Sequence, residues 1–286
     1  MLRLSRRKPT LPNLIVIGAM KSGTTSLHYY LDLHPEIRMS REKELNFFIE
    51  DRNWTRGVDW YASNFDDRAR IRGESSPGYS NHPGFPGVPE RIHGLIPETR
   101  LLYLVRDPIE RMISHWIHNH ASGREDRPIH EALLARDPNP YLNRSRYWMQ
   151  LEGYLRYFPR MQLLVISFEN LWSHRIDTLR RIFSFLEVDT EVRRRRWRIA
   201  RHHTHRMRRK TPLGRMLAST APARRLAQMP VRYRWPIQDL VYRPLSRRIA
   251  RPELTGSIRK ELAHRLAEDV RQLRKYTGHE LRHWTL

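Results

Sequence analysis

A lysine and several hydroxyl side chains occupy a small-residue turn near the start of the chain. The turn follows an uncharged, β-branched run at residues 14–17 and precedes a helical pattern that begins at Thr25. Its polar and small residues are Lys21, Ser22, Gly23, Thr24, Thr25 and Ser26. The first amide groups of a helix lack acceptors, and the helix dipole adds about half a positive charge there. The sequence therefore predicts a phosphate-binding turn.

This turn differs from the loop that binds nucleoside triphosphates, G-x-x-x-x-G-K-[ST]. Gly18 and Gly23 have the spacing of that pattern and Thr25 takes its hydroxyl position, but Thr24 stands where the lysine belongs. Lys21 comes three residues earlier and would reach a group just beyond a single bound phosphate. The simpler alternative is an ordinary strand-turn-helix with a surface lysine.

Arg106 and Ser114 form a second candidate for anion binding. Residues 100–105 are an apolar run that predicts a buried strand, Arg106 follows it directly, and Ser114 comes two turns into the next helix. A guanidinium offers a planar fork to phosphate oxygens, and a hydroxyl adds a neutral donor. An ion pair from Arg106 to Asp107 or Glu110 explains the arginine equally well.

Apolar strands alternate with amphipathic helices along the first two thirds of the chain. We expect further strands at residues 70–77 and 161–167, and helices at 25–34, 58–65, 89–96, 108–117, 143–157 and 178–186. This order predicts an α/β fold with three layers, like that of P-loop proteins, and a central, mainly parallel sheet. Ligands of such sheets bind at the carboxyl ends of the strands, where the loops after Ile17 and Val105 both lie.

The composition favours anionic partners. The chain has 286 residues, a net charge of +23 and a sequence pI near 11.1, which suits nucleotides, nucleic acids, anionic lipids or acidic glycans. It has no cysteine, no signal-peptide core and no apolar run of membrane-spanning length. We therefore expect a soluble, cytoplasmic protein.

The arginine-rich segment 193–251 dominates the C-terminal third. Aromatic residues lie among its arginines, namely Trp197, Tyr233, Trp235 and Tyr242. Such a pattern is typical of a nucleic-acid or membrane-surface patch, or of solvated helices whose arginine stems cover apolar neighbours. His202, His203 and His205 lack a nearby cysteine or paired carboxylate, so we expect no metal there.

These patterns predict a single domain over residues 1–286. Its core covers 12–190, a basic helical extension covers 191–256, and a closing amphipathic helix lies within 257–286 and is terminated by Gly278.

Four motifs occur in one order along the chain. They are Lys21-Ser-Gly-Thr-Thr, Lys43-Glu44-x-x-Phe-Phe, Pro-Glu-Arg-Ile-His at 89–93, and Arg106-Asp-Pro-x-x-Arg with Ser114. Together they resemble the PAPS-dependent sulfotransferases, most closely the carbohydrate branch of heparan-sulfate-type O- and N-sulfotransferases and their bacterial relatives. The resemblance covers residues 12–190, and residues 277–281 resemble the end of the bacterial members.

The resemblance implies a role for each motif. Residues 21–26 would bind the 5′-phosphosulfate of PAPS, with Lys21 neutralising the leaving phosphate, and Arg106 and Ser114 would bind the 3′-phosphate. Glu44 would take the proton of the acceptor hydroxyl, although on local sequence alone it is more typical of a solvated surface carboxylate beside Lys43. Sulfuryl transfer would need no metal, because the moving group carries less charge than a phosphoryl group.

The acceptor side departs from the glycosaminoglycan enzymes. Those enzymes have Lys-Thr-Pro after the glutamate that matches Glu74, a histidine where Asn46 stands, and a disulfide that is absent here. We expect a hydroxyl-bearing (or amine-bearing) acceptor, such as an anionic glycan, a glycolipid or a related small metabolite. The candidate acceptor contacts are Lys43, Asn46, Glu74, Ser75, Ser76 and Tyr147, and the replacement bases for Glu44 are His28, His34 and His82.

Two other classes of function stay open at this point. A basic protein that binds nucleic acid or anionic membranes would explain the charge but not the Lys21 turn. A P-loop kinase would bind ATP with Mg²⁺, which the missing lysine after Gly23 disfavours. Alongside sulfotransfer we expect no specific nucleic acid, and peripheral contact with the inner membrane face through residues 193–251.

Overall fold

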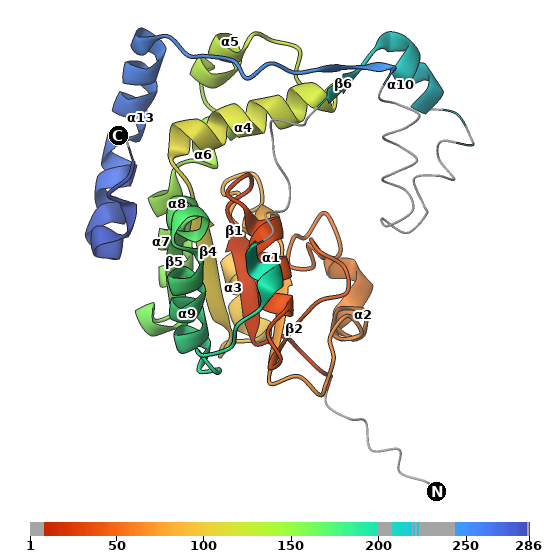
Figure 1. Ribbon diagram of the computed structural model, residues 1–286, viewed down its shortest axis with the longest axis vertical. Coiled ribbons are helices and arrows are strands. Elements are labelled where there is room, and N and C mark those ends of the chain that lie inside the picture. The colour runs from red at the N-terminus through yellow and green to blue at the C-terminus, as the bar shows by residue number, and fades with distance from the viewer. Residues whose placement is uncertain (1–8, 199–207, 219, 221, 223–243, 285) are drawn as a thin grey trace, which may run out of the picture.

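A parallel sheet forms the centre of the protein (Figure 1). The computed structural model describes residues 9–198, 208–218, 220, 222, 244–284 and 286. The sheet has five strands in the order β2-β3-β1-β4-β5, and every neighbouring pair is parallel. This confirms the predicted α/β fold.

The strands and helices alternate as the sequence predicted. The sheet contains β1 (Leu14–Gly18), β2 (Ile37–Met39), β3 (Ile71–Ser75), β4 (Arg100–Val105) and β5 (Leu163–Ser167). The helices between and after the strands are α1 (Thr24–Asp32), α2 (Gly57–Ala62), α3 (Val88–Leu95), α4 (Pro108–Ala121), α5 (Ile129–Leu134), α6 (Pro140–Asn143), α7 (Tyr147–Leu155), α8 (Phe168–Ser173) and α9 (Arg175–Leu186).

Alternate residues of the central strands supply two separate cores. Ile15 and Ile17 of β1 pack on the side that carries α3, α4 and α7, whereas Leu14 and Val16 pack on the side that carries α1 and α9. Side chains of a strand point to opposite faces in turn, so a strand covered on both faces must be apolar throughout. All five residues of β1 are buried, which explains its uninterrupted apolar sequence.

The sequence analysis missed β2. This strand has only three residues, and its central Arg38 is exposed between the buried Ile37 and Met39. It lies at the edge of the sheet, where it pairs only with β3. Three residues on an edge are too short to produce a periodic pattern, and the preceding proline also hides the strand.

The helix predicted at residues 143–157 is α7, and its predicted start is wrong. α7 begins at Tyr147, because residues 144–146 separate it from α6, which ends at Asn143. The break frees the Ser145 hydroxyl to donate to the carbonyl of Pro108, at 3.1 Å, and to accept from Nε of Arg111, at 2.7 Å. Tertiary hydrogen bonds at the start of α4 therefore outweigh local helix propensity.

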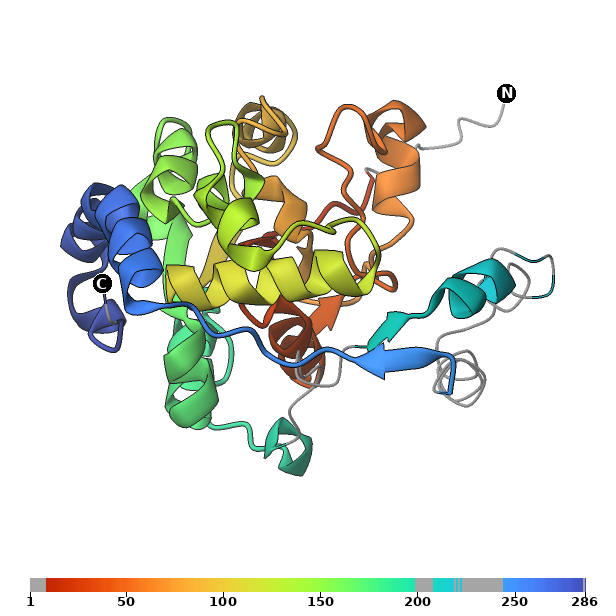
Figure 2. The same cartoon turned by 90° about the horizontal axis from the view of Figure 1, so that it is seen from above.

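The basic extension is not wholly helical where it is described. Its described part contains an antiparallel pair of strands, β6 (Arg208–Lys210) and β7 (Ser246–Arg248), with α10 (Pro212–Ala218) after β6. Figure 2 shows the chain returning from β7 beside α4 to reach α13 (Gly256–Thr277). Most of the predicted aromatic and histidine positions of the extension, Tyr233, Trp235, Tyr242, His202, His203 and His205, lie outside the described residues.

The returning segment is fastened to the first turn of α4. Arg251 and Arg259 both form ion pairs with Glu110. α13 then packs against α4, α5 and α7, and its apolar face buries Leu262 and Leu266. α13 ends at Gly278, as the sequence predicted. Among the described helices, none is long and apolar enough to cross a membrane.

Candidate active site

The turn after β1 exposes the start of α1. Gly23 is the N-cap of α1 with φ of 92°, and no side chain caps the helix. By contrast, Asp107, Ser167 and Thr255 each accept a hydrogen bond from the first turn of α4, α8 and α13. The first amide groups of α1 therefore have no acceptor from a cap, and with the helix dipole they favour an anion.

Ser22 is a second sign of a missing ligand in this turn. Its side chain is buried, and within the described part of the chain its Oγ forms no hydrogen bond of normal length, although the Tyr147 hydroxyl lies near it. Buried hydroxyls in folded proteins are nearly always paired, because an unpaired one costs about 1–3 kcal/mol. The turn therefore has an unsatisfied donor next to an uncapped helix start, which fits the phosphosulfate predicted for it.

Arg106 meets the turn from the neighbouring strand. It follows β4, which pairs with β1, and its Nη1 donates to the carbonyl oxygen of Lys21 at 3.5 Å. Its guanidinium also lies over the ring of Phe168, 4.9 Å from the centroid. Burial lowers the pKa of Arg106, although Glu169 opposes that effect. The two predicted anion-binding segments are therefore brought together at the carboxyl end of the sheet.

The alternative ion pairs for Arg106 are not formed among the residues that the structure describes. Glu110 pairs with Arg251 and Arg259 instead. Asp107 is the N-cap of α4, where its Oδ1 accepts from the backbone N–H of Glu110 at 3.0 Å. Ser114 is buried on α4, eight positions after Arg106.

Lys21 is surrounded by positive charge. Burial, together with the nearby charges of Arg106, Arg111 and Lys43, lowers its pKa to about 8, although Glu44 opposes this effect. The site thus contains more positive charge than its own carboxylates neutralise. Such an arrangement is suited to an anionic ligand with several negative charges.

Glu44 lies on the loop between β2 and α2, within electrostatic reach of Lys21. Its carboxylate is 55% exposed and forms an ion pair with Lys43 at 2.7 Å. Its backbone N–H donates to the carbonyl oxygen of Ser75 at 3.0 Å. The candidate base is therefore accessible to an acceptor and adjacent to the anion-binding turn.

The predicted acceptor contacts separate into two groups. Lys43, Asn46 and Ser75 lie beside Glu44: Lys43 through its ion pair, Asn46 through a hydrogen bond from Nδ2 to the Glu44 carbonyl at 2.8 Å, and Ser75 through its own carbonyl. The side chains of Glu74, Ser75 and Ser76 are fully buried, and Ser76 donates a hydrogen bond to Glu74. These three side chains are therefore not available to a ligand.

Tyr147 also has a role within the fold. It is buried at the start of α7, and its hydroxyl donates to the carbonyl oxygen of Arg106 at 2.8 Å. Tyr147 thus holds the segment that follows β4.

The three histidines considered as replacement bases differ in position. His28 contacts the acceptor side, because its Nδ1 lies 3.1 Å from Ser75 Oγ, and burial lowers its pKa to about 4. His34 is a core residue whose ring packs against that of Phe183 at a tilt of 49°, and both its ring nitrogens bond to backbone groups. His82 is exposed.

Ser114 was predicted from the sequence, but the polar stripe on α4 to which it belongs was not, and Arg111, His115 and His118 were given no role. Arg111, Ser114, His115 and His118 recur at i, i+3, i+4 and i+7, so they share one face of the helix. Arg111 is fully buried and donates to Ser145, to the carbonyl of Tyr141 and to His115. This periodicity of polar residues within an otherwise buried helix was the available signal.

One further cation reaches the site from another element. Arg144, in the break between α6 and α7, donates from Nε to Asn81 at 2.6 Å and points Nη1 at the Met20 sulfur at 2.7 Å. Burial lowers the pKa of Arg144 to about 10. Nothing in the spacing of the sequence connects residue 144 with the turn, because the contact depends on that break.

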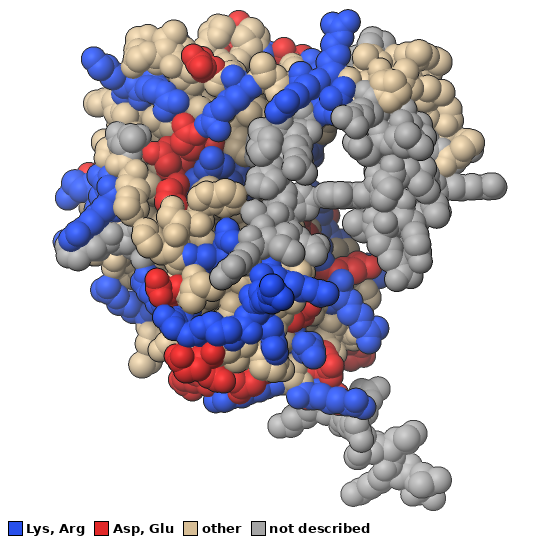
Figure 3. All heavy atoms as spheres, in the orientation of Figure 1, with Lys and Arg blue, Asp and Glu red and all other residues tan. Residues whose placement is uncertain are grey.

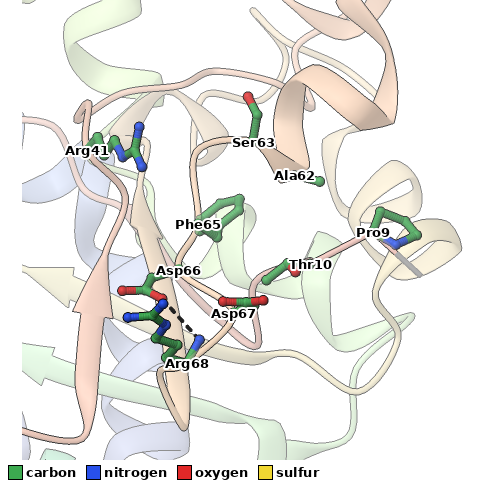
Figure 4. A pocket seen from close by; sticks show the side chains of 9 residues that line it. All are labelled: Pro9, Thr10, Arg41, Ala62, Ser63, Phe65, Asp66, Asp67 and Arg68. Atoms are coloured by element: carbon green, nitrogen blue, oxygen red, sulfur yellow. Dashed lines mark hydrogen bonds between the residues drawn. The ribbon is translucent and has the colours of Figure 1, made fainter. Parts of the chain in front are cut away.

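A separate open pocket of about 540 Å³ lies outside this site (Figure 4). Asp66, Asp67 and Arg68 lie together at one side of it and Arg41 lies apart from them. Lys21, Glu44 and Arg106 are not among its lining residues. Within the described ranges, no group of three or more potential metal ligands is present.

The depressed pKa of Lys21 gives the first prediction. In the ligand-free protein the Lys21 ammonium should titrate near pH 8, measured by NMR of protein labelled with ¹³C at the lysine ε-carbon. Arg106→Gln should raise this pKa by removing a nearby positive charge, and Glu44→Gln should lower it further. Charged Lys21 opposes folding, so its cost should diminish as the pH rises from about 8 toward 10.5. A Lys21 titration at pH 10.5 would contradict this electrostatic description of the site.

Known proteins resemble this chain in sequence or in fold. A heparan sulfate glucosamine 3-O-sulfotransferase 3B1 from Mus musculus is 34% identical over 186 residues, which are 62% of this chain and 46% of the relative. A sulfotransferase structure from Alicyclobacillus acidocaldarius matches with a TM-score of 0.66 and 24% identity over 96% of this chain and 97% of that one. The mouse sulfotransferase SULT7A1, crystallised in complex with PAP, matches with a TM-score of 0.50 and 14% identity over 93% and 88% of the two chains.

The curated relatives are longer proteins. The chain spans between 20% and 55% of the length of the first of them. The family described as the sulfotransferase domain matches residues 11–220, which include the turn, Glu44, Arg106 and the polar stripe. Because this match covers well over half of the chain, the protein belongs to the sulfotransferase domain family.

Proposed function

We propose that this protein transfers the sulfuryl group of PAPS in line onto a hydroxyl or amine of an acceptor and releases PAP. One observation carries the proposal: Lys21, the unpaired Ser22 hydroxyl and Arg106 converge at the ends of adjacent strands, with Glu44 beside them. This is an anion site with an accessible carboxylate at its edge, which is the arrangement that group transfer from an anionic donor requires.

The residues of the site fit PAPS. The amide groups at the start of α1 and the Ser22 hydroxyl would hold the 5′-phosphosulfate, with help from the hydroxyls of Thr24, Thr25 and Ser26. Arg106 and Ser114 would hold the 3′-phosphate. The fold of SULT7A1, a PAP-bound sulfotransferase, supports this donor, and so does membership of the family.

The chain's own groups would do the electrostatic work of the reaction. PAPS supplies the sulfuryl group and leaves as PAP. Lys21 would neutralise charge that develops on the leaving phosphate, and its ammonium form predominates below about pH 8. A sulfuryl group carries less charge than a phosphoryl group, so positioned donors of this kind can suffice where kinases use Mg²⁺.

Glu44 would be the general base. A carboxylate in that position can accept the proton of the acceptor hydroxyl as the new bond to sulfur forms, an effect worth about 10²–10⁴-fold in rate. Lys43 holds the carboxylate by an ion pair at 2.7 Å, and the 55% exposure leaves it open to the acceptor.

We propose a carbohydrate, a glycolipid or a related small metabolite as the acceptor. The 3-O-sulfotransferase 3B1 relative acts on heparan sulfate glucosamine, which supports a glycan. Asn46 lies beside Glu44 here in place of the histidine of the glycosaminoglycan enzymes, and the buried Ser75 stands in place of their lysine. That difference supports an acceptor other than a heparan polymer.

We further propose that the protein works in the cytoplasm, at the surface of an anionic membrane. Figure 3 shows lysine and arginine side chains spread over one face of the protein, with a band of them across its lower half. Arg193–Arg196, Arg247 and Arg248 are exposed, and α10 exposes Leu213, Met216 and Leu217 nearby in the same extension. Basic side chains next to an apolar helix face suit contact with lipid headgroups.

The donor site is tested by calorimetric titration with PAP, and with ATP and Mg²⁺ for comparison. We expect micromolar PAP binding without metal. Lys21→Ala and Arg106→Ala should each weaken it at least about tenfold, because each removes a charge-assisted contact. Lys260→Ala, which removes an exposed lysine of α13, is the matched control and should change nothing. Binding of ATP with Mg²⁺ instead of PAP would favour a kinase.

The base is tested by Glu44→Gln. This variant should bind PAP as the wild type does but lose about 10²–10⁴-fold in transfer to whichever glycan or glycolipid acceptor the wild type sulfates. Transfer is measured with ³⁵S-labelled PAPS. Normal turnover by the variant would assign the proton transfer to another residue, with His28 the nearest alternative.

The membrane contact is tested by sedimentation with vesicles that contain 30% phosphatidylserine. Arg247→Glu with Arg248→Glu should reduce binding at least about 30-fold, since each basic residue near an anionic surface contributes about 1 kcal/mol. Lys260→Glu with Arg271→Glu, on the exposed side of α13, changes the net charge by the same amount and is the control. Equal loss in both variants would attribute the binding to net charge alone, and tight binding to arbitrary duplex DNA would favour a nucleic-acid partner.

A further inference from the structure

Glu74 is a fully buried carboxylate that the proposed reaction does not use. It lies near the end of β3 and accepts three hydrogen bonds, from the hydroxyls of Tyr61 at 2.5 Å, Ser76 at 2.8 Å and Tyr79 at 2.9 Å. Among the described residues, no lysine, arginine or histidine forms an ion pair with it. Burying a carboxylate that is held only by neutral donors costs free energy. The presence of Glu74 at this position therefore points to a role for its charge.

Two of its three donors also accept hydrogen bonds from the loop that carries Glu44. The backbone N–H of Asn46 donates to Ser76 Oγ at 3.0 Å, and the backbone N–H of Phe48 donates to the Tyr79 hydroxyl at 3.3 Å. The carboxylate is therefore linked to two amide groups of that loop, each through one hydroxyl.

The third donor reaches the same loop by packing. The ring of Tyr61 stacks on Phe47, with 4.2 Å between the centroids and 8° between the planes. Next to these contacts, the Glu44 N–H bonds to the Ser75 carbonyl, and Asn46 Nδ2 bonds to the Glu44 carbonyl. Every group that Glu74 orients thus contacts the segment 44–48.

The loop needs such support because its backbone is strained. Glu44 has φ of 66° and Asn46 has φ of 49°, both in the left-handed region that favours glycine. Each such residue costs about 1 kcal/mol or more, so the conformation persists only when the surroundings impose it.

The direction of the hydrogen bonds shows how Glu74 imposes the conformation of the loop 44–48. A hydroxyl has one proton, and an ionised carboxylate can only accept. Ser76 and Tyr79 donate their hydroxyl protons to Glu74, so each hydroxyl oxygen can only accept a further hydrogen bond. The backbone N–H groups of Asn46 and Phe48 donate to these two oxygens. The negative charge thus fixes the polarity of both chains of hydrogen bonds.

We propose that ionised Glu74 is a positioning residue for Glu44, acting through the hydroxyls of Ser76 and Tyr79 to hold the loop that presents the base. This proposal rests on the proposed function, since the role of Glu44 as base belongs to that function. It concerns the geometry of the loop and is therefore testable without any acceptor.

The titration of Glu74 should make the conformation of the loop 44–48 depend on pH. Burial raises the pKa of Glu74 to about 6, and its three hydroxyl hydrogen bonds oppose that effect. The other titratable groups that face it are Tyr61 of α2, Tyr79 after β3 and Tyr154 of α7, whose pKa values burial raises well above 10, so they stay neutral. As the pH falls through about 6, Glu74 gains a proton and must donate, which conflicts with the protons of its partners. The loop should therefore loosen below pH 6 and not above it.

The test is Glu74→Gln, which keeps the size of the side chain but places an NH₂ donor against the hydroxyls. Hydrogen exchange is followed by NMR in the PAP-bound protein. At pH 7.5 the amides of Asn46 and Phe48 should exchange about tenfold faster than in the wild type, because their acceptors are reoriented. The wild type should show the same rise between pH 7 and pH 5, relative to its other amides, and the variant should lack it. The PAP affinity of Glu74→Gln should stay within about twofold of that of the wild type, while its kcat falls about tenfold or more.

Glu125→Gln is the matched control. Glu125 is also buried and also accepts from a tyrosine hydroxyl, that of Tyr141 at 3.0 Å, but it does not contact segment 44–48. It should leave exchange at Asn46 and Phe48 unchanged. Should Glu74→Gln fail to fold, Ser76→Ala and Tyr79→Phe each remove one of the two links, and each should accelerate exchange at its own amide alone.

The outcomes separate this proposal from the function on which it rests. Unchanged exchange and an unchanged pH profile in Glu74→Gln would overturn the positioning role, whatever Glu44 does. Faster exchange together with a fully active Glu44→Gln would support the positioning of the loop and remove the base assignment instead.

Discussion

The structure depends on positive charge that is gathered in one partly buried place without an equal number of carboxylates. Burial lowers the pKa values of Lys21, Arg106 and Arg111, and the charges of Arg106 and Arg111 also lower that of Lys21. A folded chain accepts such repulsion only where the rest of the fold is stable enough to impose it. Here the two cores on either side of the sheet supply that stability. A multiply charged anion that binds at this place would then relieve repulsion that the empty fold must bear.

The parallel sheet explains why these groups can meet at all. Residues far apart in the sequence, such as Lys21 and Arg106, become neighbours because the strands before them pair in parallel and end on the same side. Two glycines are required in and before the cation-rich turn. Gly23 has φ of 92°, which only glycine adopts easily, and a Cβ on Gly18 would lie 1.9 Å from Ser80 Oγ. The acceptor side follows a different logic, since left-handed Glu44 and Asn46 are held there by hydrogen bonds to residues 75 and 76.

The central architecture and the donor side of the site were predictable because they are local signals. The apolar runs, the turn at Lys21 and the strand end at Arg106 each occupy one short stretch, and parallel pairing then brings them together. Residues such as Arg144 and Glu74 could not be placed in this way. Arg144 reaches the turn only because the helix breaks at Ser145, and Glu74 turned out to be buried, although it had been expected to contact the acceptor. Both depend on tertiary hydrogen bonds that override local propensity, which no spacing in a single sequence reveals.

The fastening of Glu110 by Arg251 and Arg259 has a consequence for biosynthesis. Arg251 lies 141 positions after Glu110, so this ion pair can form only after the ribosome has added the later part of the chain. During translation, the β1 turn and Arg106 can therefore emerge and pair while Glu110 still lacks both of its ion-pair partners. The hydrogen bonds between Ser145 and the start of α4 can form earlier than these ion pairs. The part of the fold around the anion-binding turn would then assemble before α13 is attached to it.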